Sequence, residues 1–528
     1  MRLLRTVLCA TVVLAAPHAL RAQADEWWHH VTVLAHDSMR GRETGSPEHQ
    51  TAAIYVASEF RRAGLAPLTS TGFLQSVPFI ERRIDEDKSS VELVRDKKRE
   101  KLVLGQDVSF VTRAPLAKHV EAPVAFVGYG LHLPELGHDD LAGIDLQGKI
   151  VVYLSGMPKG LPGAVVSHAR AQAWPAFRER GAVGMIVFSG SPKVDTTFIR
   201  AERNRLRPQM ALGDPKLDTQ RGNKTSLQFN AARGEKLFAG SPQRFATLIA
   251  RSDSGLPLPH FDLAVRVRTT TSTSERPITS DNVAGVLPGH DDVLQHEYVV
   301  LTAHLDHIGV GAPVNGDSIN NGAMDNASGV ALLIQTARAL SVVRDSLRRS
   351  VLFLAVTGEE KGLLGSRYYA NHSTVPANGT IIANLNTDMF LPLMPFRLLM
   401  VNGLEESDLA DDVRRVGQAM GVEVITDPEP EENRFVRSDQ YSFILRGVPA
   451  LSLKVGFRRD SPEHELVKKF RADRYHQPSD DLNQPVDRQA AADFSRTYVE
   501  LVKAVANRPT RPAWYPTSFF AGLQKTSK

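Results

Sequence analysis

Hydrophobic and polar positions follow different patterns in different parts of the chain. Near the amino-terminal end, apolar residues between positions 53 and 63 recur at helical spacing. Ser46 can cap this helix, Pro47 suits its first turn, and Gly64 can end it. The pattern therefore predicts a helix that begins at Pro47 and stops close to Gly64.

The middle of the chain favours strands. Residues 88–113 alternate apolar and polar positions around the charged run Arg95–Lys101, which predicts a hairpin with a solvated, charged turn. Residues 120–275 contain short apolar runs bounded by glycines and a helical stretch at about 170–180, and they end in the Thr/Ser-rich segment 269–274. We expect this region to form a separate, β-rich unit.

From residue 281 onward, short apolar runs alternate with helical patterns. Such alternation is typical of an α/β fold, here a mixed, mostly parallel sheet with helices on both faces. The predicted strands are 298–303, 351–357, 380–385, 397–401 and 450–454, and the predicted helices are about 327–341, 361–371, 406–420 and 487–506.

Composition and charge narrow the class of protein. The chain has 528 residues, of which 42% are hydrophobic and 23% charged, as in ordinary globular proteins with two or three domains. Its formal net charge is +4, and three arginines within residues 1–24 account for most of that excess. Net charge therefore gives no support for a nucleic-acid or membrane partner.

The first 24 residues resemble a secretory signal peptide. Two arginines precede the apolar run Val7–Ala16, and Ala22-Gln23-Ala24 fits a small-x-small cleavage site. The apolar run is too short to cross a bilayer, although a membrane anchor or a buried helix is the alternative interpretation. The only cysteine, Cys9, lies in this run, so the mature chain would lack disulfides and thiolate ligands. We expect a secreted or periplasmic protein without membrane contact after cleavage.

Candidate chemistry lies where the predicted parallel strands end, which is where open α/β sheets bind ligands. Each of these groups taken alone could be a helix cap or a surface residue, but their common position favours a metal site. Nitrogen and oxygen ligands without thiols suit zinc, manganese or cobalt. The groups are His304, Asp306 and His307 after the first strand, Glu359 and Glu360 after the second, Asp388 after the third, and Asp325 at the start of a helix.

These residues belong to sequence motifs that resemble those of the secreted co-catalytic zinc aminopeptidases, whose wider superfamily includes glutamate carboxypeptidase. The matching motifs span roughly residues 281–505, and the segment from Gly41 to Ser46 is similar to the amino-terminal part of that family. Residues 120–275 are similar to the protease-associated domain inserted in many members. The motifs are HLDHIG from His304, NGAMDNASG from Asn321, TGEEKGLLGS from Thr357, NLNTD from Asn384 and YHQPSDD from Tyr475.

The resemblance implies a di-zinc exopeptidase that acts on peptides, with manganese or cobalt as possible substitutes for zinc. Asp325 would bridge the two metals and Glu359 would be the general base. Asp306 would orient the imidazole of His304, and Tyr475 would stabilise the tetrahedral intermediate. His304 and Asp388 would bind one metal ion, and Glu360 and His476 the other.

The chain departs from the family pattern at Gln440, where a histidine is usual, and His464 is an alternative to His476 as a ligand. The expected activity is that of an aminopeptidase. A carboxypeptidase would need a cationic pocket, which Arg200, Arg203, Arg205 and Arg207 could supply, and a non-catalytic binding protein on the same fold is the third alternative. The oligomeric state stays open. The expected segments are a signal peptide at 1–24, catalytic parts at 25–119 and 276–510, a protease-associated domain at 120–275, and a tail at 511–528.

Overall fold

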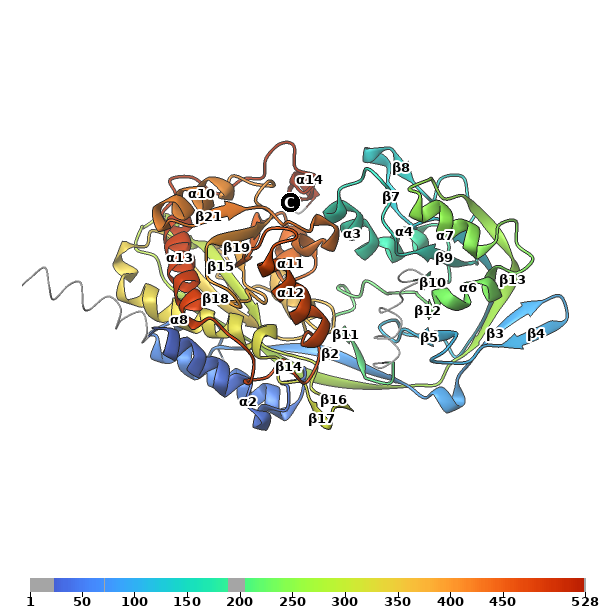
Figure 1. The fold of residues 1–528 in the computed structure, drawn as a ribbon, viewed down its shortest axis with the longest axis horizontal. Coiled ribbons are helices and arrows are strands. Elements are labelled where there is room, and N and C mark those ends of the chain that lie inside the picture. The colour runs from blue at the N-terminus through green and yellow to red at the C-terminus, as the bar shows by residue number, and fades with distance from the viewer. Residues whose placement is uncertain (1–22, 71, 189–204, 527–528) are drawn as a thin grey trace, which may run out of the picture. The chain divides into compact units, whose positions relative to one another are not determined.

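The computed structural model describes residues 23–70, 72–188 and 205–526 (Figure 1). They form two compact units: one contains the described residues up to Val77 and from Thr279 onward, and the other contains Pro78–Ile278. Most of the predicted signal peptide, residues 1–22, lies outside the described residues. The described chain begins in a helix over residues 23–34.

A mixed sheet forms the centre of the larger unit. Four neighbouring strands, in the order β18, β15, β19 and β22, run parallel, while β14 runs antiparallel to β18 and β20 runs antiparallel to β22. This arrangement confirms the predicted fold class. The sheet order is β11 (Gln209–Leu212), β2 (Leu74–Ile84), β14 (Thr273–Leu287), β18 (Ser350–Val356), β15 (Glu297–His304), β19 (Thr380–Asn386), β22 (Ala450–Val455), β20 (Leu398–Asn402) and β21 (Glu423–Ile425), and β1 (Ala66–Pro67) pairs with β14.

Helices cover both faces of this sheet, because successive strand residues point to opposite sides. Leu301 and Phe353 pack into the core formed with α2, α8, α10 and α13. Val300 packs on the other face, together with Tyr369 of α9 and Phe443 of α11. The helices are α2 (Pro47–Arg62), α8 (Ser328–Val342), α9 (Leu364–Asn371), α10 (Leu409–Met420), α11 (Gln440–Ile444) and α13 (Arg488–Ala506).

Local sequence patterns predicted the positions of most of these helices correctly. Helix α2 begins at Pro47, and the side chain of Ser46 accepts a hydrogen bond from the backbone of His49, as the capping pattern predicts. The sequence analysis missed α12 (Pro462–Asp473), which lies in a charged segment. Only Val467 and Phe470 give this helix an apolar contact with the core, so its helical period is faint.

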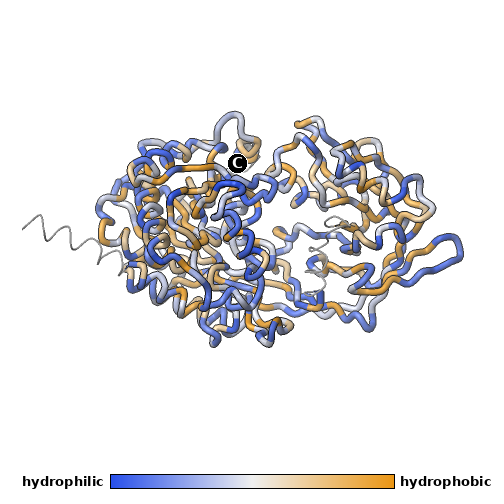
Figure 2. Tube along the Cα trace, in the orientation of Figure 1, coloured by the Kyte–Doolittle hydropathy of each residue, from blue (hydrophilic) through white to orange (hydrophobic). Residues whose placement is uncertain are grey.

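The smaller unit is built on an eight-stranded sheet. The predicted hairpin is present as β3 and β4, but Lys98–Lys101 of the expected turn form the strand β4. Every residue of β4 is exposed, in keeping with the hydrophilic colour at the outer end of the hairpin in Figure 2. The order is β4 (Lys98–Lys101), β3 (Ser90–Arg95), β13 (His260–Thr270), β6 (His119–Val127), β9 (Ile150–Leu154), β10 (Gly184–Phe188), β12 (Thr225–Phe229) and β5 (Val108–Phe110), with α3 (Gly163–Ala171), α4 (Ala173–Glu179), α6 (Gly234–Phe238) and α7 (Phe245–Asp253).

The smaller unit begins at Pro78 instead of at the predicted residue 120. Residues 78–119 join it because β3 pairs with β13 and β5 pairs with β12, through partners such as Val91 with Thr269. The segment predicted as a tail, residues 511–528, belongs to the larger unit, where Trp514 and Phe520 are buried. No helix in the described ranges is both long enough and apolar enough to cross a bilayer.

Candidate metal centre

The carboxyl ends of three parallel strands bring the candidate ligands to one edge of the sheet. In the pairing register, His304 at the end of β15 lies beside Val356 at the end of β18, and Thr302 lies beside Asn386 at the end of β19. The residues that follow these ends therefore converge. This edge is buried: His304 is 1% exposed and Asp388 is 9% exposed.

One cluster joins His304, Asp325 and Asp388. Nε2 of His304 lies 3.1 Å from Oδ1 of Asp325 and 3.4 Å from Oδ1 of Asp388. The other ring nitrogen, Nδ1, lies 3.0 Å from the main-chain oxygen of Asp306. A carbonyl oxygen can only accept, so Nδ1 carries a hydrogen, and Nε2 is the ring nitrogen that a metal ion could bind.

A second cluster uses the other oxygen of Asp325. Nε2 of His476 lies 3.2 Å from Oδ2 of Asp325 and 3.2 Å from Oε2 of Glu360. Nδ1 of His307 lies 2.8 Å from Oε1 of Glu360 and 3.9 Å from Oδ2 of Asp325. Asp325 thus offers one carboxylate oxygen to each cluster, which is the arrangement that a bridging ligand needs.

His307 is the ligand candidate that the sequence analysis left without a role. It is fully buried, and although Nδ1 is close to Glu360, neither ring nitrogen makes a well-aligned hydrogen bond with a described residue. Oε1 of Glu360 is likewise buried and makes no well-aligned hydrogen bond with a described residue. Two polar atoms that face the same point without bonding to each other are what a shared metal ion would satisfy. The position of His307, three residues after the end of β15, is the sequence signal that could have identified it as a ligand candidate.

The charges of the site also fit divalent cations. The pKa of His304 is raised well above its usual value, since Glu359 and the nearby aspartates outweigh the opposing effect of burial. The pKa of Asp325 is held far below its usual range by His304 and His476, although burial acts in the other direction. Buried carboxylates that share a site need positive charge, and imidazole with carboxylate oxygens is a donor set that zinc accepts. The residues present therefore fit zinc.

The side chain of Asp306 makes other contacts than the predicted one with His304. The side chain was expected to orient His304, but the main-chain oxygen makes that contact because β15 ends at His304 and the chain turns there. The carboxylate of Asp306 instead accepts hydrogen bonds from the backbone of Glu359 (3.1 Å) and Glu360 (3.3 Å) and from the hydroxyl of Thr44 (3.0 Å). It therefore positions the two glutamates.

Burial and neighbouring carboxylates raise the pKa of Glu359 well above its usual value, with Asp388 and Glu360 the main acidic neighbours. Tyr475 lies next to His476, with 3.9 Å between the ring centroids. Burial, together with Asp325, raises the pKa of Tyr475 well above its usual value, so the phenol keeps its proton.

Two further residues hold the loop that carries Asp325. The carboxylate of Asp480 accepts hydrogen bonds from the backbone of Met324 and Asp325, both at 3.0 Å. The buried guanidinium of Arg42 donates to the main-chain oxygens of Leu305 (2.9 Å), Asn321 (2.7 Å) and Gly322 (3.0 Å). Asp480 lies in the same segment as His476, so it connects two ligand-bearing loops. Both residues lie in motifs that are recognisable in the sequence, but the motifs alone do not predict these contacts.

Other candidates lie outside the two clusters. Gln440 is buried and donates to the main chain of Phe435 (2.9 Å), and it accepts from Asn386 (2.7 Å), so it supports β19. His464 pairs with Glu429 at 3.0 Å and joins neither cluster. Among the arginines proposed for a carboxylate pocket, Arg205 pairs with Glu86 at 3.2 Å, whereas Arg200 and Arg203 lie outside the described residues.

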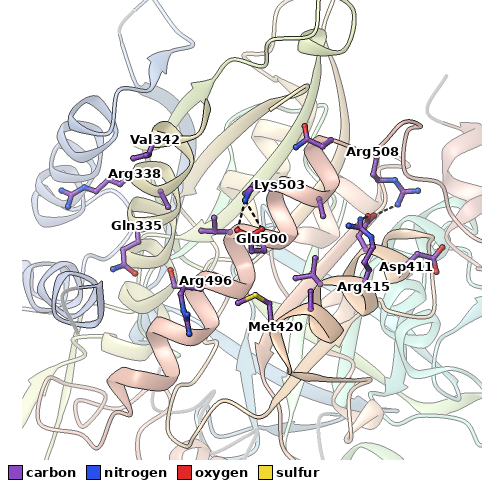
Figure 3. A pocket seen from close by; sticks show the side chains of 18 of the residues that line it. Gln335, Arg338, Val342, Asp411, Arg415, Met420, Arg496, Glu500, Lys503 and Arg508 are labelled. Carbon is purple, nitrogen blue, oxygen red and sulfur yellow. Dashed lines mark hydrogen bonds and ion pairs between the residues drawn. The ribbon is translucent and has the colours of Figure 1, made fainter. Parts of the chain in front are cut away.

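A cavity of about 1110 Å³ in the larger unit contains none of the candidate ligands. It is lined mainly by residues of α8, α10 and α13, as Figure 3 shows. Its charged side chains are paired, for example Lys503 with Glu500 at 2.8 Å and Arg508 with Asp412 at 2.6 Å. The cavity is therefore separate from the candidate metal centre.

Fold and site together define a class of protein: an α/β chain with a buried, two-cluster histidine–carboxylate centre at the carboxyl edge of a parallel sheet. Residues 282–502 match the sequence model of peptidase family M28. The segment contains all of the candidate ligands that follow β15, β18 and β19, and His476.

Individual relatives match over shorter stretches. The chain is 29% identical over 185 residues to a probable leucine aminopeptidase 2 of Aspergillus oryzae, covering 34% of each chain. It is 31% identical over 111 residues to Aminopeptidase YwaD of Bacillus subtilis, covering 21% of this chain and 22% of that one. The matched region thus spans about a third or less of these relatives.

A solved structure is similar over most of the chain. The aminopeptidase from Aneurinibacillus sp. strain AM-1 superposes with a TM-score of 0.53 and 17% sequence identity, covering 94% of this chain and 97% of that one. At this identity the likeness establishes a shared fold.

Proposed function

We propose that the chain is an exported di-zinc exopeptidase, and specifically an aminopeptidase. The observation that carries this proposal is the sharing of Asp325 between two clusters, with one carboxylate oxygen in each. The match of residues 282–502 to a peptidase family model and the names of the relatives support the activity.

Two zinc ions held by these clusters would polarise the scissile carbonyl group and lower the pKa of a water molecule between them. His304 and Asp388 would hold one ion, and Glu360 and His476 the other. Asp325 would contribute to both. Manganese or cobalt would fit the same nitrogen and oxygen donors.

Glu359 is the proposed general base, which accepts a proton from the attacking water and delivers it to the leaving amine. Its raised pKa suits a group that must hold a proton between these two steps. Its backbone is fixed by the carboxylate of Asp306, and this contact limits how far the side chain can move. Tyr475, which stays protonated, would donate a hydrogen bond to the oxyanion of the tetrahedral intermediate.

In an aminopeptidase the free amine of the substrate must meet negative charge near the reacting bond. Glu359 and Asp388 are the candidate carboxylates for that role, and both lie close enough to His304 to interact with its charge. A carboxypeptidase would instead require a cation for the terminal carboxylate. A non-catalytic binding protein would be expected to lack a ligand or the base, and this chain has all of them.

The test is cleavage of one peptide by the mature protein in free, N-acetylated and C-amidated forms, with and without a chelator. We expect chelator-sensitive cleavage that N-acetylation alone abolishes, since the acetyl group removes the charged amine. Loss of cleavage on C-amidation alone would establish the carboxypeptidase instead. A zinc-loaded protein that cleaves no form would favour the binding protein.

The leader and the inserted unit remain parts of this proposal. Export follows from the signal-like residues 1–24, and amino-terminal sequencing of protein from the culture medium or periplasm tests cleavage after Ala24. We also propose that the smaller unit is a protease-associated domain. Its β-rich sheet and its insertion between Val77 and Thr279 support this assignment.

A further inference from the structure

A small cavity lies beside the candidate metal centre, at the carboxyl ends of β19 and β22. Met389, which directly follows Asp388, lines it, and so does Lys454 near the end of β22. Apolar side chains such as Leu391, Val455 and Phe457 form much of the wall. The carboxyl ends of the strands in open α/β sheets are where ligands bind, so a substrate held at Asp388 would have this cavity next to it.

Lys454 is the feature of this cavity that needs an explanation. Its side chain is only 8% exposed, and it makes no hydrogen bond or ion pair with any residue that the structure describes. The two other cations of the wall are paired, since Arg434 and Arg471 each donate to Oε2 of Glu429 at 2.6 Å. Arg434 also pairs with Asp427 at 2.5 Å.

A buried ammonium group without a partner is costly. One explanation is that Lys454 only offsets the charges of Asp388 and Asp325, whose fields act on it. An ion pair with either carboxylate would serve that purpose directly, but neither lies within ion-pair distance of the ammonium group, although other buried cations of this unit, such as Arg349 with Glu297 at 2.7 Å, make such contacts. The absence of an ion-pair partner for the ammonium group of Lys454 points instead to a ligand that carries an anionic group.

The size and walls of the cavity limit what that group can be. Its volume is about 50 Å³, and a bound water needs roughly 10–15 Å³ by the same measure, so only a few non-hydrogen atoms fit. A carboxylate on one or two methylene groups matches this volume. The apolar wall would contact the methylene groups, and Lys454 would bind the charged end.

We propose that this cavity binds a carboxylate of the peptide residue next to the scissile bond, with Lys454 as the residue that selects it. The inference rests on the proposed peptidase function and narrows its substrate class. The carboxylate has two possible sources: the side chain of an amino-terminal Asp or Glu, or the terminal carboxylate of a short peptide. Both sources present the same chemistry to Lys454.

Two pairs of substrates separate these sources in the zinc-loaded full chain. The first pair is the p-nitroanilides of Glu and Gln, which have nearly the same shape and differ in charge. The second is a dipeptide with a free amino terminus and either a free or an amidated carboxyl terminus. A charge-assisted hydrogen bond to Lys454 should favour the carboxylate member of one pair by about tenfold or more in kcat/KM.

Lys454→Met keeps the length of the side chain and removes the charge. The ratio of kcat/KM between the carboxylate substrate and its neutral partner should therefore fall close to one, while kcat/KM for the Gln or amide substrate changes little. Lys454→Gln is a second variant with a polar end, and thermal unfolding checks that both variants fold. Lys468→Met on α12 is the matched control, because Lys468 is exposed and pairs with Glu465 at 2.9 Å. The control should keep the wild-type ratio.

The outcomes are distinct. If the wild-type protein cleaves the Gln and amide substrates with the same kcat/KM as their carboxylate partners, the inference is overturned and the peptidase function still holds. A carboxylate preference that survives in both Lys454 variants would also overturn it. If the zinc-loaded wild type cleaves no substrate at all, the proposed function fails, and this inference fails with it.

Discussion

At the scale of single residues, the candidate centre is a set of imidazole and carboxylate side chains whose donor atoms lie close enough together to hold metal ions. Asp325 faces both clusters, and His307 and Glu360 have buried polar atoms that no described residue satisfies. The ring of His304 is oriented by the main-chain oxygen of Asp306. Substitutions here should therefore affect metal binding and turnover separately, according to which atom is removed.

Glu359→Gln should lower kcat by about 10²–10⁴-fold, because glutamine cannot take up the proton. Zinc content should stay at the wild-type level, since Glu359 is not among the proposed ligands. Activity assays and metal analysis on the same preparation check both statements. Turnover close to wild type would remove Glu359 from the role of base, and loss of zinc would make it a ligand.

His307→Ala should weaken binding of one of the two zinc ions by about 10–100-fold, because the imidazole faces Glu360 and Asp325 in the second cluster. His307→Asn should recover part of the affinity, since its amide oxygen can replace a ring nitrogen as a metal ligand. Competition with a chromophoric chelator measures the affinity. His464→Ala is the control, because it removes a buried histidine that pairs with Glu429 outside the site. Equal zinc affinities in wild type and His307→Ala would contradict this role.

At the scale of elements, the loops after the parallel strands are held by buried polar contacts rather than by apolar packing. The carboxylate of Asp306 fixes the loop after β18, and Asp480 connects the segment of His476 to the loop of Asp325. Helix α2 is fixed similarly, since Nδ1 of His49 contacts the hydroxyl of Ser280 at 3.1 Å, which in turn contacts Thr357 at 2.7 Å. These contacts keep the ligand-bearing loops in place relative to the sheet.

Asp480→Asn should loosen the loop of Asp325, because the amide has one acceptor oxygen for two backbone N–H groups. We expect a loss of about 1–3 kcal/mol in the stability of these contacts and weaker zinc binding. Hydrogen exchange at residues 323–327 measures the loosening. Asp481→Asn, which changes the neighbouring and more exposed aspartate, should leave the exchange unchanged. Equal exchange in the two variants would show that Asp480 does not hold the loop.

Burial, with a smaller effect of Arg42, lowers the pKa of His49 from 6.5 to about 3. The unfolded chain therefore binds a proton between these pH values and the folded chain does not. The folded state should keep the full contribution above pH 6.5 and lose stability as the pH falls towards 3, by up to about 1.4 kcal/mol per pH unit. His49→Gln should flatten this part of the profile in urea unfolding, whereas His36→Gln, at an exposed site, should not. A profile that His49→Gln leaves unchanged would contradict the assignment.

The sequence predicts elements well where their cause is local. The strands that end at His304, Val356 and Asn386 and the helix capped by Ser46 follow from apolar periodicity and capping, and the strand ends alone predicted a shared site. The start of the smaller unit was wrong because β3 pairs with β13, more than 160 residues away, and no local pattern records that partner. Likewise, the ring direction of His307 depends on the turn that follows β15.

At the scale of the whole molecule, the metal centre belongs entirely to the larger unit. Every proposed ligand lies in residues 279–528, and none lies in Pro78–Ile278. The centre is also built from loops on three parallel strands and from the segment of His476, so ligands far apart in the sequence would share the same ions. Metal binding should therefore stabilise the larger unit and leave the smaller unit largely unaffected.

Zinc should bind the folded larger unit and stabilise it by about 2.7 kcal/mol per site at a free concentration 100 times the dissociation constant. Hydrogen exchange of the full chain, with zinc and with chelator, locates the effect. Exchange in β15, β18 and β19 should slow with zinc, whereas exchange in β6, β9 and β10 should not change. Asp325→Ala is the matched variant, and because this residue faces both clusters it should lose zinc at both sites and most of the protection. Equal slowing in both units, or full zinc content in Asp325→Ala, would contradict a centre that is confined to the larger unit and joined through Asp325.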